Sequence, residues 1–227
     1  MALIKSGILG NLTGSVRNVT GRIRNGKNYL SGKPDHYTAP RDEQSIARRK
    51  KFKLSIMFAK SVNELKDLKL LWETNTANGL NAFNSITQVN YKLMKNNLLS
   101  ASNVIVPLNG FPITSLSAEL NSSALDVTIN EIGNGEFFNL SVEKSLKLYS
   151  VICLSSPNIQ GIEDYAFVPI ESPKQPFSAD TQVTFNAPVG PYQSSLLVKY
   201  DEKHFYFVAV TLDDNDIPVH HSLTLYQ

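Results

Sequence analysis

The stretch from Gly7 to Lys53, GILGNLTGSVRNVTGRIRNGKNYLSGKPDHYTAPRDEQSIARRKKFK, sets the organisation expected for the whole chain. Glycine recurs through its first half, and basic side chains recur along its full length. A segment with so many glycines and charges buries too little apolar surface to become ordered by itself. We therefore predict a basic, glycine-rich arm over residues 1–40 that becomes ordered against another surface.

A β-hairpin is predicted inside this arm, over residues 15–32. Asn25-Gly26 is a strong signal for a two-residue turn, because a type I′ turn needs positive φ at both central positions. Like charges opposite one another destabilise a strand pair, so the basic side chains of this hairpin either extend into water or meet carboxylates or phosphates. The predicted register places these side chains on one face as the pairs Arg24–Lys27 and Arg22–Tyr29.

Three helices are predicted in a helical region over residues 41–97. The first covers residues 38–60, with Asp42 as its N-cap. The second begins at the capping-box pattern of residues 61–64, and the third covers about residues 80–96. From Phe52 to Ala59 the first helix is apolar on nearly all sides, so we expect other elements to enclose it.

Residues 98–227 change character, because short runs of β-branched and aromatic residues alternate with turn residues. This rhythm is typical of an antiparallel β-sandwich of immunoglobulin-like type, although the Cys…Trp…Cys pattern of true immunoglobulin domains is absent. The fold class predicted for the chain is therefore α+β. The candidate strands are Ser102–Val106, Thr114–Leu120, Leu125–Ile132, Lys147–Ser155, Tyr165–Pro169, Thr181–Phe185, Leu196–Tyr200, Phe205–Leu212 and Ser222–Tyr226.

Charge is distributed unevenly along the chain. Residues 1–60 hold thirteen Lys and Arg against three Asp and Glu, a net charge of +10. Residues 61–227 hold nine Lys and Arg against seventeen Asp and Glu, a net charge of −8. This asymmetry fits two arrangements: a nucleic-acid footprint with an acidic body, or an arm that docks on the body of another copy.

The motifs of catalysis and metal binding are incomplete. The segment Gly21–Asn28 approaches the phosphate-binding pattern GxxxxGK[ST], but Asn28 lacks the hydroxyl that holds Mg²⁺ and no helix is expected to follow. No histidines have the spacing of a metal site, and Asp213–Asp216 lacks the glycine and the distal glutamate of an EF-hand loop. We therefore expect no enzyme activity, no catalytic residue, no metal, no cofactor and no small-molecule substrate.

The cellular setting is only partly indicated. Cys153 is the single cysteine, so no intrachain disulfide is expected, and its apolar surroundings predict a buried strand residue. No run approaches eighteen apolar residues, so no membrane span is predicted. The first ten residues lack the apolar region and cleavage site of a secretory signal. We expect synthesis in the cytoplasm, with incorporation into an extracellular or virion assembly left open.

Four features of the first 95 residues occur together: the glycine-spaced opening, Gly26-Lys27 at the hairpin tip, the motif QSIARRKKF from Gln44, and Ala82-Phe83-Asn84. In these features the chain resembles an uncharacterised bacterial protein family of about 200 residues. It departs from the pattern at Ile23, where the family often has tryptophan. The resemblance implies an architecture of helical arm and β-sandwich, and it carries no activity or site.

Two functions are compatible with these features, and a third, a sandwich that binds carbohydrate or protein through its loops, rests only on Tyr192 and Phe177 in Pro/Gly-rich segments. The first is a structural subunit of a homopolymer, such as a filament, tube or virion-like shell, in which the arm clamps a neighbouring subunit. The second is sequence-independent nucleic-acid binding through the basic arm and helix. The residues expected at a subunit interface or polyanion site are Arg22, Arg24, Lys27, Tyr29, Arg48, Arg49, Lys50 and Lys51. The apolar residues expected at the subunit interface are Ile8, Leu9, Phe52 and Ile56.

Overall fold

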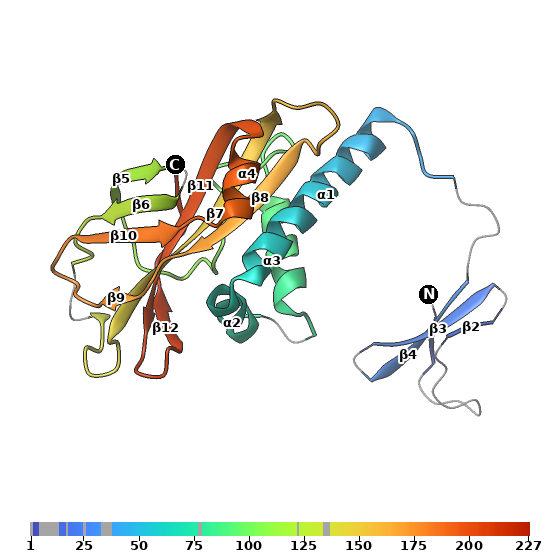
Figure 1. Ribbon diagram of the computed structural model, residues 1–227. Coiled ribbons are helices and arrows are strands. Elements are labelled where there is room, and N and C mark those ends of the chain that lie inside the picture. The colour runs from blue at the N-terminus through green and yellow to red at the C-terminus, as the bar shows by residue number, and fades with distance from the viewer. Residues whose placement is uncertain are drawn as a thin grey trace. The chain divides into compact units, whose positions relative to one another are not determined.

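Two long antiparallel strands, β7 (Ser145–Pro157) and β11 (Tyr200–Leu212), form the centre of the fold (Figure 1). Nearly every central position of β7 is buried, as expected for a strand with both faces covered. The computed structural model describes residues 2–4, 14–16, 18–24, 26–32, 38–76, 79–121, 123–133 and 137–227. The two strands pair along their full length, from Ser145 opposite Leu212 to Pro157 opposite Tyr200.

A six-stranded antiparallel sheet is built around this pair. Its order is β12-β11-β7-β8, with one short strand added beside β11 and another beside β7. A second sheet has the order β10-β6-β5. The bounds are β5 (Ser115–Leu120), β6 (Ala124–Ile129), β8 (Tyr165–Glu171), β9 (Gln175–Pro176), β10 (Val183–Pro188), β12 (Pro218–His221) and β13 (Leu225–Tyr226).

The two faces of the six-stranded sheet pack against different layers. Alternation along β7 turns Leu148 and Ile152 toward the three-stranded sheet, where they share a core with Val127. The same alternation turns Val151 toward a core that also contains Phe58 from the helices. Figure 1 shows α1, α2 and α3 on one side of the sheet and β5, β6 and β10 on the other. The α+β fold class is therefore confirmed, with mainly antiparallel sheets.

The three predicted helices are present as α1 (Glu43–Glu64), α2 (Lys66–Thr74) and α3 (Ala82–Leu93). Asp42 caps α1 as predicted, since its Oδ1 accepts a hydrogen bond from the amide of Ser45 at 2.9 Å. The predicted start of the second helix at Ser61 is wrong. Ser61 is buried within α1, and the chain becomes extended only at Leu65, which precedes α2.

Two predicted strands are absent. Residues 102–106 form turns and bends, because Asn103 and Val104 bond to the side chain of Asn90 instead of joining a ladder. Most of the predicted strand 196–200 belongs to or follows the short helix α4 (Pro191–Leu197). Proline occupies the first turn of α4, and the Gln193 side chain accepts a hydrogen bond from the Gly190 amide at 2.8 Å. Strand β12 was not predicted.

The chain divides into two compact units, Met1–Ile46 and Ala47–Gln227. The N-terminal unit contains a four-stranded sheet of order β1-β4-β3-β2. Its central hairpin has the predicted register, and Gly26 adopts a positive φ of 71° at the turn. The bounds are β1 (Ala2–Ile4), β2 (Gly14–Val16), β3 (Val19–Arg24) and β4 (Lys27–Gly32).

The sheet of the N-terminal unit has one apolar and one basic face. In this register Val19, Ile23 and Leu30 share a face, and Arg22 and Lys27 occupy the other. Val19 is 43% exposed and Ile23 is 40% exposed. Of the residues in β2–β4 whose burial is described, only Gly21, which has no side chain, is buried. This sheet therefore has no core of its own in the part of the chain that is described.

The structure also bears on membrane insertion. Within the described ranges, none of the helices combines the length and the apolar character that crossing a membrane requires.

Candidate interface site

The predicted arm residues lie on the sheet of the N-terminal unit. Arg22 pairs with Tyr29 and Arg24 pairs with Lys27 across β3 and β4. Arg22 and Lys27 are exposed and Tyr29 is half-buried. The structure therefore brings these four positions together on one hairpin, while the predicted Ile8 and Leu9 lie outside the described residues.

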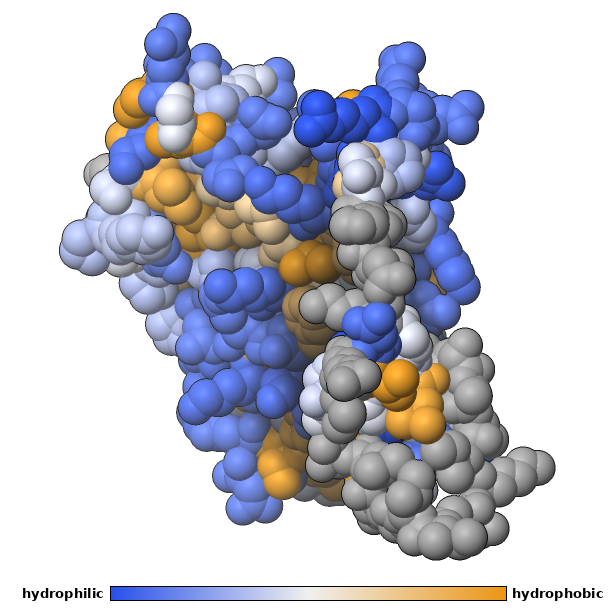
Figure 2. Space-filling model, turned by 90° about the vertical axis from the view of Figure 1, so that its right-hand side faces the viewer, coloured by the Kyte–Doolittle hydropathy of each residue, from blue (hydrophilic) through white to orange (hydrophobic). Residues whose placement is uncertain are grey.

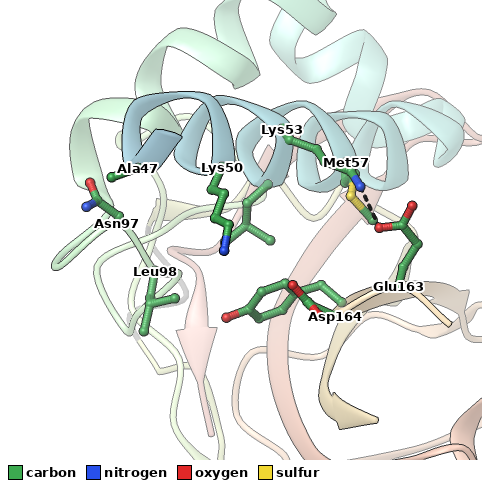
Figure 3. Close-up of a pocket in the computed structure, with 10 residues that line it drawn as sticks. Ala47, Lys50, Lys53, Met57, Asn97, Leu98, Glu163 and Asp164 are labelled. Carbon is green, nitrogen blue, oxygen red and sulfur yellow. Dashed lines mark hydrogen bonds and ion pairs between the residues drawn. The ribbon is translucent and has the colours of Figure 1, made fainter. Parts of the chain in front are cut away.

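The four basic residues of α1 predicted as site residues do not share one face. Arg48, Arg49, Lys50 and Lys51 occupy successive helical positions, each turned by about 100° from the last. The ammonium of Lys51 lies 4.6 Å from the centre of the Tyr91 ring and 3.5 Å from the Met94 carbonyl oxygen. Lys50 extends from α1 toward a pocket (Figure 3). The two lysines therefore have different surroundings: Lys51 packs against Tyr91 and Met94, whereas Lys50 lines the pocket.

The apolar half of α1 is covered by the chain's own elements. Phe58 is fully buried, with ring centroids 5.7 Å from Phe167 and 5.2 Å from Tyr206. Ile56 is half-buried, and only Phe52 remains widely exposed, at 53%. The expected enclosure of Phe52–Ala59 by other elements is therefore confirmed for most of this segment, and the covering elements belong to the same chain. The aromatic partners of Phe58 could not be identified from the sequence, because they lie more than a hundred residues away from it.

A pocket of about 340 Å³ lies between α1 and the start of β8. Leu54, Met57, Leu98 and Tyr165 give it an apolar lining. Figure 3 shows Lys50 and Asp164 approaching it from opposite sides. The space-filling view of Figure 2 shows hydrophobic surface set among hydrophilic side chains on one face of the molecule.

The charges around this pocket differ in their pairing. Lys53 and Glu163 form an ion pair at 2.5 Å, with both side chains largely exposed. Lys50 and Asp164 form no hydrogen bond or ion pair through their side chains with any described residue. Because exposed ion pairs contribute little stability, the Lys53–Glu163 pair leaves this rim easy to rearrange.

A second pocket of about 300 Å³ adjoins the first and shares Leu98, Asp164 and Tyr165 with it. We call the two together the α1 groove. Asp164 and Glu202 line the second pocket, and no Lys or Arg of the described chain does. The Ser155 hydroxyl donates a hydrogen bond to Glu202 Oε2 at 2.8 Å. Hydrogen bonds from Ser155 and then Ser156 lower the pKa of Glu202, so this carboxylate is ionised at neutral pH.

Two further polar side chains of the groove, Cys153 and His204, are buried or hydrogen-bonded. Cys153 is 2% exposed, and burial raises the pKa of its thiol to about 12, so the thiol is protonated and unreactive at neutral pH. Nδ1 of His204 lies 2.9 Å from the hydroxyl of Tyr226. In the described ranges no three His, Cys, Asp or Glu residues are grouped so that they could hold a metal ion. The groove thus offers apolar surface and carboxylates for binding.

Sequence reasoning did not find the groove residues. Asp164 and Glu202 are separated by the whole of β8, β10 and α4, and no spacing rule connects them. The adjacent acids Glu163 and Asp164 lie in the turn before β8, which is a signal only for an exposed loop. Of the predicted residues, only Lys50 lines the groove.

Comparison with known proteins does not assign the chain to a family. No family model matches it, and no curated protein matches it. Among solved structures, the chain is similar to DesR, a β-glucosidase from Streptomyces venezuelae in complex with D-glucose, with 12% identity and a TM-score of 0.23. The match covers 50% of this chain and 14% of that one, so the chain spans a small part of the glucosidase. This likeness is too slight to indicate a fold or an activity.

Proposed function

We propose that the protein is a non-enzymatic structural subunit of a homopolymeric assembly, in which the N-terminal unit of one copy binds the body of the next. A contact between two different surfaces is heterologous, and it propagates into a filament, tube or shell unless it closes into a ring. The body is the unit Ala47–Gln227, and the donated part is the unit Met1–Ile46.

The observation that carries this proposal is that the described residues of the N-terminal sheet form no buried core. Its described side chains are at most half-buried, and Val19 and Ile23 of its apolar face are 43% and 40% exposed. Small sheets need packing against another layer for stability.

Charge supports a contact between copies. The unit Met1–Ile46 holds seven Lys and Arg against three Asp and Glu, a net charge of +4. The unit Ala47–Gln227 holds fifteen against seventeen, a net charge of −2. Opposite net charge speeds encounter between such surfaces and disfavours pairing of like units.

We further propose that the two facing sheets of the body form an immunoglobulin-like sandwich to which the helices are added. It is supported by the mainly antiparallel pairing in both sheets and by the core that they share. A strand order outside that family of folds, determined by NMR spectroscopy, would contradict this part.

Deletion of residues 1–35 tests the proposed function. We expect the intact chain to form species whose mass, measured by light scattering, grows with concentration, and the shortened chain to remain a monomer. Circular dichroism and thermal unfolding serve as controls that the body is still folded. If both chains have the same mass at every concentration, the proposal is wrong. Steeply salt-dependent binding of a single-stranded oligonucleotide by the intact chain, without self-association, would instead favour the nucleic-acid function.

A further inference from the structure

The α1 groove exposes apolar surface, and one of the carboxylates that line it has no side-chain partner among the described residues. Its floor includes Leu98, which is 49% exposed, and the half-buried Tyr165. At one end, Asp164 and Glu202 place two carboxylates beside this apolar floor. Asp164 has no side-chain partner among the described residues. Such a surface suits a ligand that combines an apolar side chain with a cation.

The hairpin of β3 and β4 carries an exposed apolar side chain on one face and cations on the opposite face. Ile23 lies on the exposed apolar face, and it is preceded in the same strand by Arg22. Lys27 begins the partner strand, one residue pair from Ile23. Basic side chains carry their charge on long flexible stems, so they can reach past the edge of a strand pair to a nearby carboxylate.

Resting on the proposed function, we infer that the α1 groove of one copy is the docking site for the β3–β4 hairpin of a second copy. Ile23 covers the apolar floor at Leu98 and Tyr165. The cations of the hairpin lie at the end of the groove that holds Asp164 and Glu202.

The distribution of charge within the groove fixes this orientation. Lys50 and Lys53 line the wall formed by α1, so cations of an incoming hairpin are repelled from that wall. Glu163 is already paired with Lys53. The end with Asp164 and Glu202 has no Lys or Arg in its described lining, and it therefore attracts the cations. The orientation of the bound hairpin is therefore set by repulsion between its cations and the lysines of α1, and by attraction of the cations to Asp164 and Glu202.

A charge-swap cycle on the full chain tests the inference. The groove variant carries Asp164→Lys with Glu202→Lys, and the hairpin variant carries Arg22→Glu with Lys27→Glu. We expect each variant alone to lower the association constant at least about tenfold. The chain with all four substitutions should recover most of the loss, because it restores opposite charges in reversed order. A matched control reverses Asp180 and Asp214, two exposed acids that do not line the groove, and should assemble like the unchanged chain.

The apolar contact has its own pair of variants. Ile23→Asn removes the proposed anchor, whereas Thr20→Asn changes the opposite face of the same strand. We expect Ile23→Asn to weaken association and Thr20→Asn to leave it unchanged. All variants are first compared by thermal unfolding, so that a misfolded body is not read as a lost contact.

The outcomes separate this inference from the proposed function. If deletion of residues 1–35 abolishes assembly but the groove variant assembles normally, the hairpin docks elsewhere and only the inference is wrong. If the four-fold variant shows no recovery, the opposed charges do not meet and the inference is likewise overturned. If deletion of residues 1–35 has no effect on assembly, both fail together.

Discussion

At the scale of the residue, Asn90 connects α3 to the segment after it. It is fully buried, and its Nδ2 donates to the carbonyl oxygen of Val104 at 2.9 Å. Its Oδ1 accepts hydrogen bonds from the backbone amide of Val104 and from the side-chain Nδ2 of Asn103. Asn90→Ala leaves these buried groups without hydrogen-bond partners and should lower the free energy of unfolding by about 3 kcal/mol. Urea denaturation measures this loss. Asn84→Ala, on the exposed side of the same helix, should change it by less than about 0.5 kcal/mol.

The roles of individual residues could be predicted from the sequence where the interacting residues are close together in the chain. Asp42 was identified as an N-cap because its partner, Ser45, is three positions away. The pairing of Arg22 with Tyr29 followed from a two-residue turn. Asp164 and Glu202 were missed because they meet only after several elements have folded. Nothing in the sequence distinguishes Lys50, which lines the groove, from Lys51, whose ammonium lies over the Tyr91 ring.

At the scale of the element, Gly110 allows the segment before β5 to lie against the chain after β12. A Cβ at this position would lie 2.3 Å from the carbonyl carbon of Ser222 and 2.6 Å from the carbonyl oxygen of His221. Ser222 cannot move aside, because its amide and hydroxyl both bond to Ala209 of β11. Gly110→Ala should therefore cost about 3 kcal/mol or more in unfolding free energy.

The control for this substitution is Gly190→Ala, where the new Cβ would meet only the Gln193 side chain, at 3.5 Å. We expect that variant to lose less than about 1 kcal/mol. Thermal or urea unfolding of the two variants measures the difference. Equal stability of the two variants would show that the backbone contact at Ser222 is not tight.

Element prediction succeeded for strongly patterned segments. The apolar run of β7 and the Asn-Gly turn of the β3–β4 hairpin each contain their own signal. Residues 102–106 were assigned to a strand for their β-branched residues, but the side chain of Asn90 takes their backbone groups. The short helix α4 was hidden because its apolar residues read as a strand, while the signals at Pro191 and Gln193 mark only its start.

At the scale of the whole molecule, the layer order could not be predicted from the sequence. The nearly continuous apolar run of β7 indicates two covered faces, but it does not say which face meets helices and which meets a sheet. The charge asymmetry was visible at once, yet only the structure shows that the N-terminal sheet has its own apolar face. This apolar face makes the proposed assembly directional. The proposed contact joins two different surfaces, the sheet of one copy and the α1 groove of the next, so each copy would bind head to tail.

Directional assembly predicts that a copy without its arm acts as a chain terminator. A chain lacking residues 1–35 keeps the α1 groove, so it can accept an intact neighbour's arm, but it has no hairpin to donate. Added to the intact protein at rising ratio, it should join the assemblies and shorten them, which light scattering records as falling mean mass and sedimentation records as co-pelleting. The shortened chain that also carries Asp164→Lys and Glu202→Lys is the matched control, because it can neither donate nor accept. If arms instead pair with arms, the shortened chain stays in the supernatant and the mass of the intact assemblies does not change, which would contradict head-to-tail growth.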